Sequence, residues 1–326
     1  MGIQVYLRHE GLRAPAFARV AHSELYAACL EQSAWADAQG FDVVSIAEHH
    51  GLDDGYLPAP LTLAAAIAGR TKRIRISLAL IAALHDPIRL AEQIAVLDLV
   101  SQGRETLIMV PGYRREEFEM AGIDRAQRGR LLEEAVETMR QAWTGEPFTW
   151  RGRTVRVTPK PRVPPSVMVA GATAAAARRA ARLRAGFHAA VSDPRIVDAY
   201  RAECARLGIA AGGIVGGSPV SCVHVSDDPE RDWTRIAPYA LYDAQTYASW
   251  GVPGAADHVP RTLADLRRNS RYRVVTPDEC VELAQETGMV LLQPIPCGLP
   301  LEWGWASLEL FAAKVLPRLR GTGTGA

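Results

Sequence analysis

Glu48, His49 and His50 are three consecutive titratable residues that stand directly before a loop rich in Gly and Asp. Carboxylate and imidazole groups are the side chains most used for general acid–base catalysis near neutral pH. An apolar run that is typical of a buried strand precedes them. The tripeptide is therefore a candidate proton-transfer site, although the same residues would also serve as hydrogen-bonding groups of a loop.

His85 and Asp86 follow another apolar run and precede Pro87. The two residues have the chemistry of a base and its orienting carboxylate. However, Asp before Pro is also typical of a helix start, with Asp as the N-cap and Pro at the first helical position. We favour the helix-cap interpretation.

Two further segments have the chemistry of anion binding. Gly112, Tyr113 and Arg114 follow a predicted strand, where a Gly next to guanidinium groups suits an anion but is also common in exposed loops. Gly171, Ala172 and Thr173 stand between a predicted strand and a predicted helix. The free N–H groups of such a turn form a phosphate site.

Strand-like and helix-like segments alternate along the whole chain and would position these residues. The predicted strands cover residues 3–7, 42–47, 73–81, 106–110, 167–170, 186–191, 219–225 and 290–295. The predicted helices cover residues 24–39, 61–70, 88–100, 127–143, 174–183, 194–207, 277–287 and 307–319. This order predicts an α/β fold, a single (β/α)8 TIM-barrel domain over residues 1–326, with active-site residues at the carboxyl ends of the strands.

Two segments interrupt the alternation. Residues 145–165 contain an alternating pattern around Gly152, which predicts a small hairpin after the fourth helix. Residues 227–275 form a long, aromatic-rich insertion after the seventh strand. Its rings have helical spacing, so they either line a substrate pocket or form a packing face. They are Trp233, Tyr239, Tyr242, Tyr247 and Trp250.

Composition limits the class of protein. The net charge of +1 predicts no nucleic-acid or anionic-membrane partner, and no apolar stretch reaches the length of a membrane span. The five cysteines are widely spaced, without a metal-binding motif, so we expect no metal site and a cytoplasmic location. A dinucleotide or P-loop motif is also absent from the sequence.

Taken together, these segments resemble the bacterial luciferase-like monooxygenase family, whose members are flavin-dependent (β/α)8 barrels. The resemblance covers nearly the whole chain, in the family's order and spacing. The matching segments are Glu48-His49-His50, Asp86 to Glu92, Leu97 to Arg104, Gly112-Tyr113-Arg114 with Glu116-Glu117-Phe118, and Phe311 to Pro317.

The resemblance implies a role for each matching residue. His49 would be the acid or base near the flavin, supported by Glu48 and His50. The flavin ring would lie on Leu78 and Ala79, joined by a non-proline cis peptide bond, and near Gly112, Tyr113 and Arg114. The flavin phosphate would rest on Gly171, Ala172 and Thr173.

One departure from the family affects the phosphate site. Relatives carry an Arg at the end of the fourth strand, where this chain has Pro111. A charge-assisted contact to phosphate contributes about 1.5–3 kcal/mol. Flavin would therefore bind more weakly, unless Arg114 or Arg115 substitutes for the missing guanidinium.

The resemblance also implies the reaction. We expect a two-component monooxygenase that takes FMNH2 from a separate reductase, activates O2 as a flavin C4a-(hydro)peroxide and oxygenates a small, apolar organic substrate. One alternative is a hydride-transfer enzyme that uses the deazaflavin F420, and another is a non-catalytic flavin-binding protein or partner subunit. Family members form homodimers through the helices that correspond to residues 61–70 and 88–100.

Overall fold

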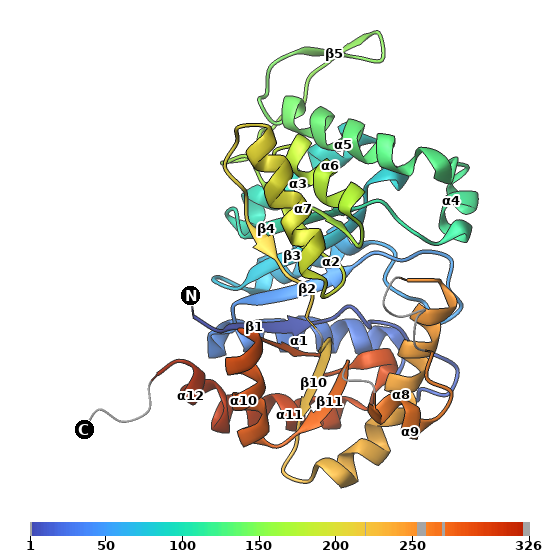
Figure 1. Cartoon of the computed structure of the whole chain (residues 1–326), viewed down its shortest axis with the longest axis vertical. Coiled ribbons are helices and arrows are strands. Elements are labelled where there is room, and N and C mark those ends of the chain that lie inside the picture. The colour runs from blue at the N-terminus through green and yellow to red at the C-terminus, as the bar shows by residue number, and fades with distance from the viewer. Residues whose placement is uncertain (1, 219, 253–258, 269–270, 322–326) are drawn as a thin grey trace. The chain divides into compact units, whose positions relative to one another are not determined.

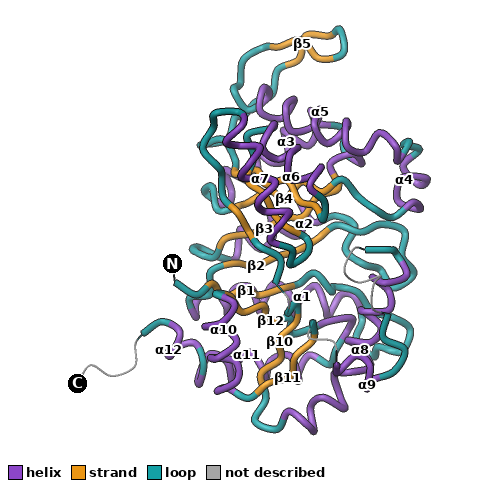
Figure 2. Tube along the Cα trace, viewed as in Figure 1, coloured by secondary structure: helices purple, strands orange, loops and turns teal. Residues whose placement is uncertain are grey.

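The computed structural model describes residues 2–218, 220–252, 259–268 and 271–321. The chain divides into two compact units (Figure 1). The first unit takes its residues from 1–46, 52–58 and 218–326, and the second from 47–51 and 59–217. In each unit the strands lie together and the helices pack around them (Figure 2). None of the described helices is long and apolar enough to cross a membrane.

The first unit contains parallel strands in the order β11-β10-β12-β1-β2. These strands are β1 (Gln4–Arg8), β2 (Val43–Ala47), β10 (Cys222–Val225), β11 (Tyr272–Val275) and β12 (Met289–Leu292). Its helices are α1 (His22–Gln39), α8 (Pro229–Ser249), α9 (Leu263–Arg268), α10 (Pro277–Thr287), α11 (Leu301–Lys314) and α12 (Leu316–Leu319), with the 3-10 turn η3 (Pro296–Gly298).

The second unit contains parallel strands in the order β3-β4-β7-β8-β9. These strands are β3 (Arg75–Ile81), β4 (Glu105–Val110), β7 (Ser166–Gly171), β8 (Gly186–Ala189) and β9 (Ile214–Val215). Its helices are α2 (Pro60–Arg70), α3 (Pro87–Ser101), α4 (Arg115–Ala121), α5 (Arg128–Ala142), α6 (Ala174–Arg182) and α7 (Pro194–Arg206), with the 3-10 turns η1 (Ala82–Leu84) and η2 (Arg125–Gln127).

The predicted strands and helices are present, with ends that differ by a few residues. The predicted hairpin is confirmed as β5 (Phe148–Trp150) paired antiparallel with β6 (Arg153–Val155). The sequence analysis missed the short strands β9 and β11 and the helices α4, α8 and α9, of which the last two lie in the aromatic insertion. The predicted closing helix is interrupted at Val315, which lies between α11 and α12.

The cis peptide bond expected between Leu78 and Ala79 is wrong. Within the described residues the cis bond is that between Thr158 and Pro159. The reason is visible in β3, where Ile76 to Ile81 pair in unbroken parallel register with Glu105 to Val110 of β4. Such a continuous ladder is built from extended, trans peptide units.

A small apolar cluster lies beneath the carboxyl ends of β3 and β4. Ile81, Ala83 and Phe118 are buried there together, so α4 is fixed to the strand ends through Phe118. Gly112 has φ +76°, and a Cβ at this position would come within 2.8 Å of the Phe118 ring. Glycine is therefore required at residue 112, both for the turn and for the close packing of α4.

Candidate functional site

The carboxylate of Glu48 is the centre of a hydrogen-bonded group that follows β2. It accepts hydrogen bonds from the Ile81 N–H at 2.6 Å, from His50 Nε2 at 2.8 Å and from His85 Nε2 at 2.9 Å. Burial acts to raise the pKa of Glu48, but the donors, led by His50 and His85, outweigh it and lower the pKa to about 2. Glu48 is therefore ionised at neutral pH and acts as an acceptor that orients both imidazoles.

His50 contacts Glu48 through its side chain and Glu117 through its backbone. The hydrogen bond to Glu48 raises the pKa of His50 above its usual value, against the smaller effect of burial. Its backbone N–H donates to Glu117 Oε1 at 3.1 Å. Both ends of the residue are thus fixed, which makes His50 a positioning group for its neighbour His49.

His49 is buried, with a carboxylate on one ring nitrogen and a phenol on the other. Nδ1 lies 3.2 Å from Glu117 Oε1, and Nε2 lies 3.4 Å from the Tyr113 hydroxyl. The two rings meet edge to face, with centroids 5.9 Å apart. Glu117 comes from α4 and is itself buried. The arrangement has the order carboxylate, imidazole, phenol.

This order fixes the tautomer of His49. A carboxylate can only accept, so the proton of a neutral imidazole lies on Nδ1, facing Glu117. Nε2 is left as an acceptor, to which the Tyr113 hydroxyl donates. His49 is therefore arranged to receive a proton at Nε2 and to pass one on through Tyr113.

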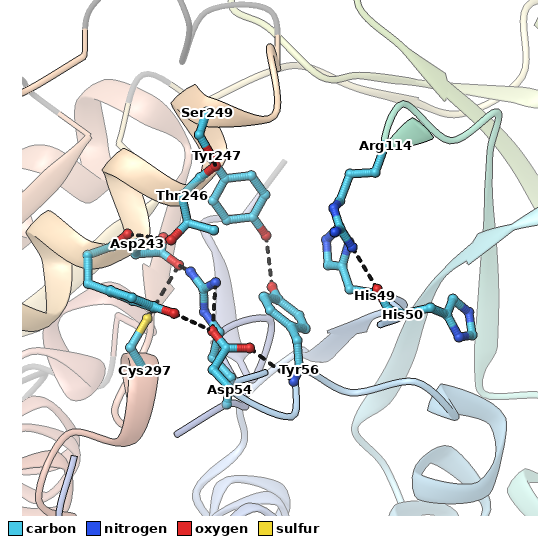
Figure 3. A network of polar contacts seen from close by, with 12 residues as sticks. His49, His50, Asp54, Tyr56, Arg114, Asp243, Thr246, Tyr247, Ser249 and Cys297 are labelled. Atoms are coloured by element: carbon cyan, nitrogen blue, oxygen red, sulfur yellow. Dashed lines mark hydrogen bonds and ion pairs between the residues drawn. The ribbon is translucent and has the colours of Figure 1, made fainter. Parts of the chain in front are cut away.

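Arg114 contacts both His50 and Glu117. Its guanidinium is buried, donates to the His50 carbonyl at 2.6 Å and lies 3.4 Å from Glu117 Oε1 (Figure 3). Arg115 is exposed and pairs with Glu119 at 2.6 Å. Arg114 is thus engaged with the tripeptide and Glu117, and Arg115 with Glu119.

The alternative for His85 and Asp86 is settled in favour of the helix cap. The Asp86 carboxylate accepts from the N–H groups of Ile88 and Arg89, both at 3.0 Å, at the start of α3. His85 instead donates to Glu48. The sequence analysis treated His85 apart from the tripeptide, whereas the structure places it in the same group.

The turn predicted to hold a phosphate links β7 to α6. Thr173 is the N-cap of α6 and accepts from the Ala176 N–H at 3.2 Å. A Cβ on Gly171 would lie 2.3 Å from the Cβ of Ala176, so only glycine allows this tight connection. The first N–H groups of a helix have no partner within it. The turn, including Ala172, therefore presents backbone donors and a small surface.

Leu78 and Ala79 differ in the exposure of their side chains. The Leu78 side chain is completely buried, while Ala79 is partly accessible. The Ala79 carbonyl accepts from the Glu48 N–H at 3.1 Å, which joins β3 to the tripeptide. Of this pair, only Ala79 offers side-chain surface for a cofactor.

The aromatic insertion forms a buried group in the first unit around Arg13. The Arg13 guanidinium pairs with Asp54 at 3.2 Å and with Asp243. We call this group the Arg13 cluster (Figure 3). Its members are Arg13, Asp54, Tyr56, Tyr242, Asp243, Tyr247, Trp250, Tyr272 and Cys297.

The rings of the Arg13 cluster pack on the guanidinium and bond to its carboxylates. Tyr56 and Tyr242 lie with ring centroids 4.8 and 5.0 Å from the guanidinium carbon. The Tyr242 hydroxyl donates to Asp54 at 2.8 Å, and the hydroxyls of Tyr56 and Tyr247 lie 2.8 Å apart. These contacts support the packing interpretation of the insertion. The sequence analysis did not identify Arg13, which belongs to no recognised motif and stands between Arg8 and Arg19 in the chain.

Comparison with known proteins places this geometry in a family. The profile described as luciferase-like monooxygenase matches residues 12–285. The chain belongs to this family. A monooxygenase from Streptomyces bottropensis, RslO1, has a solved structure that superposes with a TM-score of 0.80 and 26% identity, over 97% of this chain and 99% of that one. The fold of this family member is accordingly the predicted (β/α)8 barrel.

A curated relative and a further solved structure are named for different cofactors. The FMNH2-dependent dimethylsulfone monooxygenase of Pseudomonas fluorescens is 26% identical, over 78% of this chain and 76% of that one. An F420-dependent secondary alcohol dehydrogenase superposes with a TM-score of 0.74 at 17% identity, covering 98% of this chain and 100% of that chain, which shows the fold alone. Several curated relatives match over a shorter segment, and the chain spans only 30–37% of their length.

The sequence analysis named the tripeptide but not its contacts with Glu117. A signal was present: Glu116 and Glu117 are followed by Phe118, Glu119 pairs with Arg115 four residues earlier, and Gly122 is a helix C-cap. This pattern predicts a short helix with one buried face. It would have placed Glu117 beside Phe118 at a strand end.

Proposed function

We propose that this protein is the oxygenase component of a two-component monooxygenase. It would accept FMNH2 from a separate reductase and use O2 to oxygenate a small, mainly apolar organic molecule. Membership of the luciferase-like family and the FMNH2-dependent relative support the cofactor class. The observation that carries the proposal is the buried chain of contacts from Glu117 through His49 to Tyr113, in which Nδ1 faces the carboxylate and Nε2 faces the phenol.

The residues present fit a flavin at two places. The first turn of α6 with Gly171, Ala172 and Thr173 would hold the phosphate through backbone N–H groups. Ala79, Gly112, Tyr113 and His49 would lie at the ring, with the completely buried Leu78 contributing only backbone. A bound reduced flavin supplies the electrons that activate O2.

The protein's own residues would manage protons and water. Glu48 and Arg114 hold the tripeptide in place, and Glu117 keeps the His49 proton on Nδ1. Nε2 would then take a proton from the reacting groups or return one, with Tyr113 as the exchange partner. Because His49 and Glu117 are buried, the transfer would occur largely out of bulk water.

The phosphate site predicts modest affinity. Pro111 replaces the arginine of relatives, Arg114 bonds to His50 and Glu117, and Arg115 pairs with Glu119. The loss of one charge-assisted contact corresponds to roughly 10- to 100-fold in Kd. Such affinity suits a protein that receives reduced flavin and releases the oxidised form.

We also propose a homodimer that works in the reducing cytoplasm. All five cysteines are free and buried, which suits that compartment. α3 carries an exposed apolar stripe, which suits a contact with a second copy through the helices named in the sequence analysis.

The experiment that tests the function is anaerobic equilibrium binding of FMNH2, FMN and F420 to the purified chain. We expect FMNH2 to bind most tightly, and admission of O2 to the complex to produce an oxygenated flavin absorbance that decays more slowly than in free solution. His49→Ala should retain flavin binding but lower turnover by 10²–10⁴-fold, the range for removal of a general acid or base.

Two results would overturn the proposal. Tighter binding of F420 would assign the protein to hydride transfer. If none of the three bound, the change at Pro111 would be decisive, and a non-catalytic role would replace the enzyme.

A further inference from the structure

A separate pocket of about 510 Å³ lies in the first unit, between the end of β10, the start of α8 and one face of α11. The volume is within the range of small-molecule sites. Trp303, Ala306, Leu310 and Ala313 are spaced by three or four residues and so form one side of α11 toward the pocket. These four residues form the apolar part of the α11 wall, which Ser307 and Glu309 also line.

The charged side chains of the opposite wall are engaged with one another. Asp232 accepts from Ser226 Oγ at 2.6 Å, from Arg231 Nε at 2.8 Å and from Arg235 Nη1 at 3.2 Å. The guanidinium of Arg235 also lies 5.4 Å from the ring centroid of Trp303. A charged ligand would have to displace these contacts, so the wall favours an uncharged one.

His224 is a buried polar residue of the pocket wall. It belongs to β10, lines the pocket and is 4% exposed. Among the described residues, none hydrogen-bonds to its ring. Burial lowers the pKa of His224 to about 4, so the ring is neutral and offers one donor and one acceptor. Because the ring lines the pocket, a polar ligand atom inside it can hydrogen-bond to either ring nitrogen.

We propose that this pocket binds an uncharged, mainly apolar alcohol or phenol, whose hydroxyl pairs with His224 and whose hydrocarbon part lies along α11. The apolar face of α11 provides the contact area. The neutral imidazole provides both a donor and an acceptor, which a hydroxyl complements. The charges around the pocket balance, because Arg231, Arg235 and Lys314, which pairs with Asp227, oppose Asp227, Asp232 and Glu309 in equal number.

The test compares 4-ethylphenol with 4-ethyltoluene, which lacks only the hydroxyl. Binding to the full chain is followed by the ring nitrogen resonances of His224 in ¹⁵N-histidine-labelled protein. We expect 4-ethylphenol to bind the wild-type chain at least tenfold more tightly than 4-ethyltoluene. His224→Phe should remove that preference, leaving the two ligands within about twofold of each other.

A second variant keeps the test decisive if His224→Phe does not fold. Ala306→Trp fills the pocket from α11 and should abolish binding of both ligands, whereas Ala27→Trp, an exposed helical alanine on α1, should not. Unchanged thermal unfolding of each variant confirms folding. The proposal is overturned if 4-ethylphenol does not bind, since water alone would then occupy the pocket. It is also overturned if His224→Phe affects both ligands equally, or if Ala306→Trp binds like the wild type.

Discussion

At the scale of single residues, two buried carboxylates, Glu48 and Glu117, orient the three imidazoles of His49, His50 and His85. Glu48 accepts hydrogen bonds from the side chains of His50 and His85, and Glu117 accepts one from Nδ1 of His49. Nε2 of His49 faces a weak, exchangeable phenol. In the proposed function, proton transfer would therefore depend on these two carboxylates as much as on His49.

Glu117→Gln should impair turnover more than flavin binding. The amide can donate as well as accept, so it no longer imposes the Nδ1–H tautomer on His49. We expect turnover to fall roughly 10- to 100-fold, as for loss of a residue that orients a ligating or catalytic histidine. The ¹⁵N shifts of the His49 ring should show a change in tautomer populations.

The neighbouring Glu116→Gln is the matched control. Glu116 is 68% exposed in its side chain and lies 3.9 Å from Arg114, so its loss should leave both readouts near wild type. Equal effects of the two variants would contradict a specific role for Glu117.

Glu48→Gln should show a stability loss that depends on pH. The depressed pKa of Glu48 means that its contribution is present above its unfolded value of 4.5 and is lost as pH falls toward about 2. The raised pKa of His50 means that its contribution is present below its unfolded value of 6.5 and is lost as pH rises through its folded value. The difference from wild type should therefore be largest between pH 4.5 and 6.5.

Urea unfolding at a series of pH values measures this difference, for which we expect roughly 2 kcal/mol at the maximum. A difference that stays constant from pH 4 to pH 9 would show that Glu48 and His50 do not titrate as a pair. Asp198→Asn, which removes an exposed surface pair with Arg201, serves as the flat control.

At the scale of elements, the Arg13 cluster joins the 52–58 loop to α8 and η3. Arg13 and Asp54 come from loops, Asp243 from α8 and Cys297 from η3. Burial alone would lower the pKa of Arg13. The surrounding carboxylates and tyrosine hydroxyls outweigh this effect, so the pKa is raised. Within the first unit, this cluster is the polar counterpart of the apolar packing of α8 on β10 and β11.

Asp243→Asn should strongly destabilise the protein. The carboxylate accepts from Arg13, from the Tyr272 hydroxyl at 2.6 Å and from the Cys297 thiol at 3.5 Å, and all of these groups are buried. Removing one partner of a buried ion pair costs about 3–5 kcal/mol. Urea unfolding followed by far-UV circular dichroism measures this cost. A loss below about 1 kcal/mol, the level of a surface pair, would contradict the importance of the cluster.

The sequence predicted elements better than contacts. The pairing of Asp86 with the start of α3 and the hairpin around Gly152 depend on residues that are close in the chain, and both were predicted. The contact between His49 and Glu117 joins residues 68 positions apart, and that between Arg13 and Asp243 joins residues 230 apart. Periodicity reports which face of an element is buried, but not which distant polar group lies against it.

At the scale of the whole molecule, the exposed surface of α3 predicts self-association. Val96, Leu99 and Val100 are 50%, 40% and 45% exposed and lie on one face of the helix. An apolar stripe of this kind on a folded protein is typical of an interaction surface.

The double variant Val96→Glu with Leu99→Glu should convert a dimer to a monomer without loss of secondary structure. Light scattering coupled to size-exclusion chromatography at micromolar concentration measures the mass. Val163→Glu changes an apolar side chain that is 66% exposed outside this stripe and should leave the dimer intact. A wild-type chain that elutes as a monomer would contradict the prediction.

The division of the chain between the units limits how the protein can be cut. Residues 47–51 belong to the second unit although they precede residues 52–58 of the first. An excised fragment that begins at residue 59 would therefore lack Glu48, His49 and His50 while keeping Glu117 and Arg114, whose buried charges would lose those partners. Attempts at half-barrel expression or split-protein complementation should retain residues 47–51 with the second unit, because that short peptide completes the second unit's polar interior.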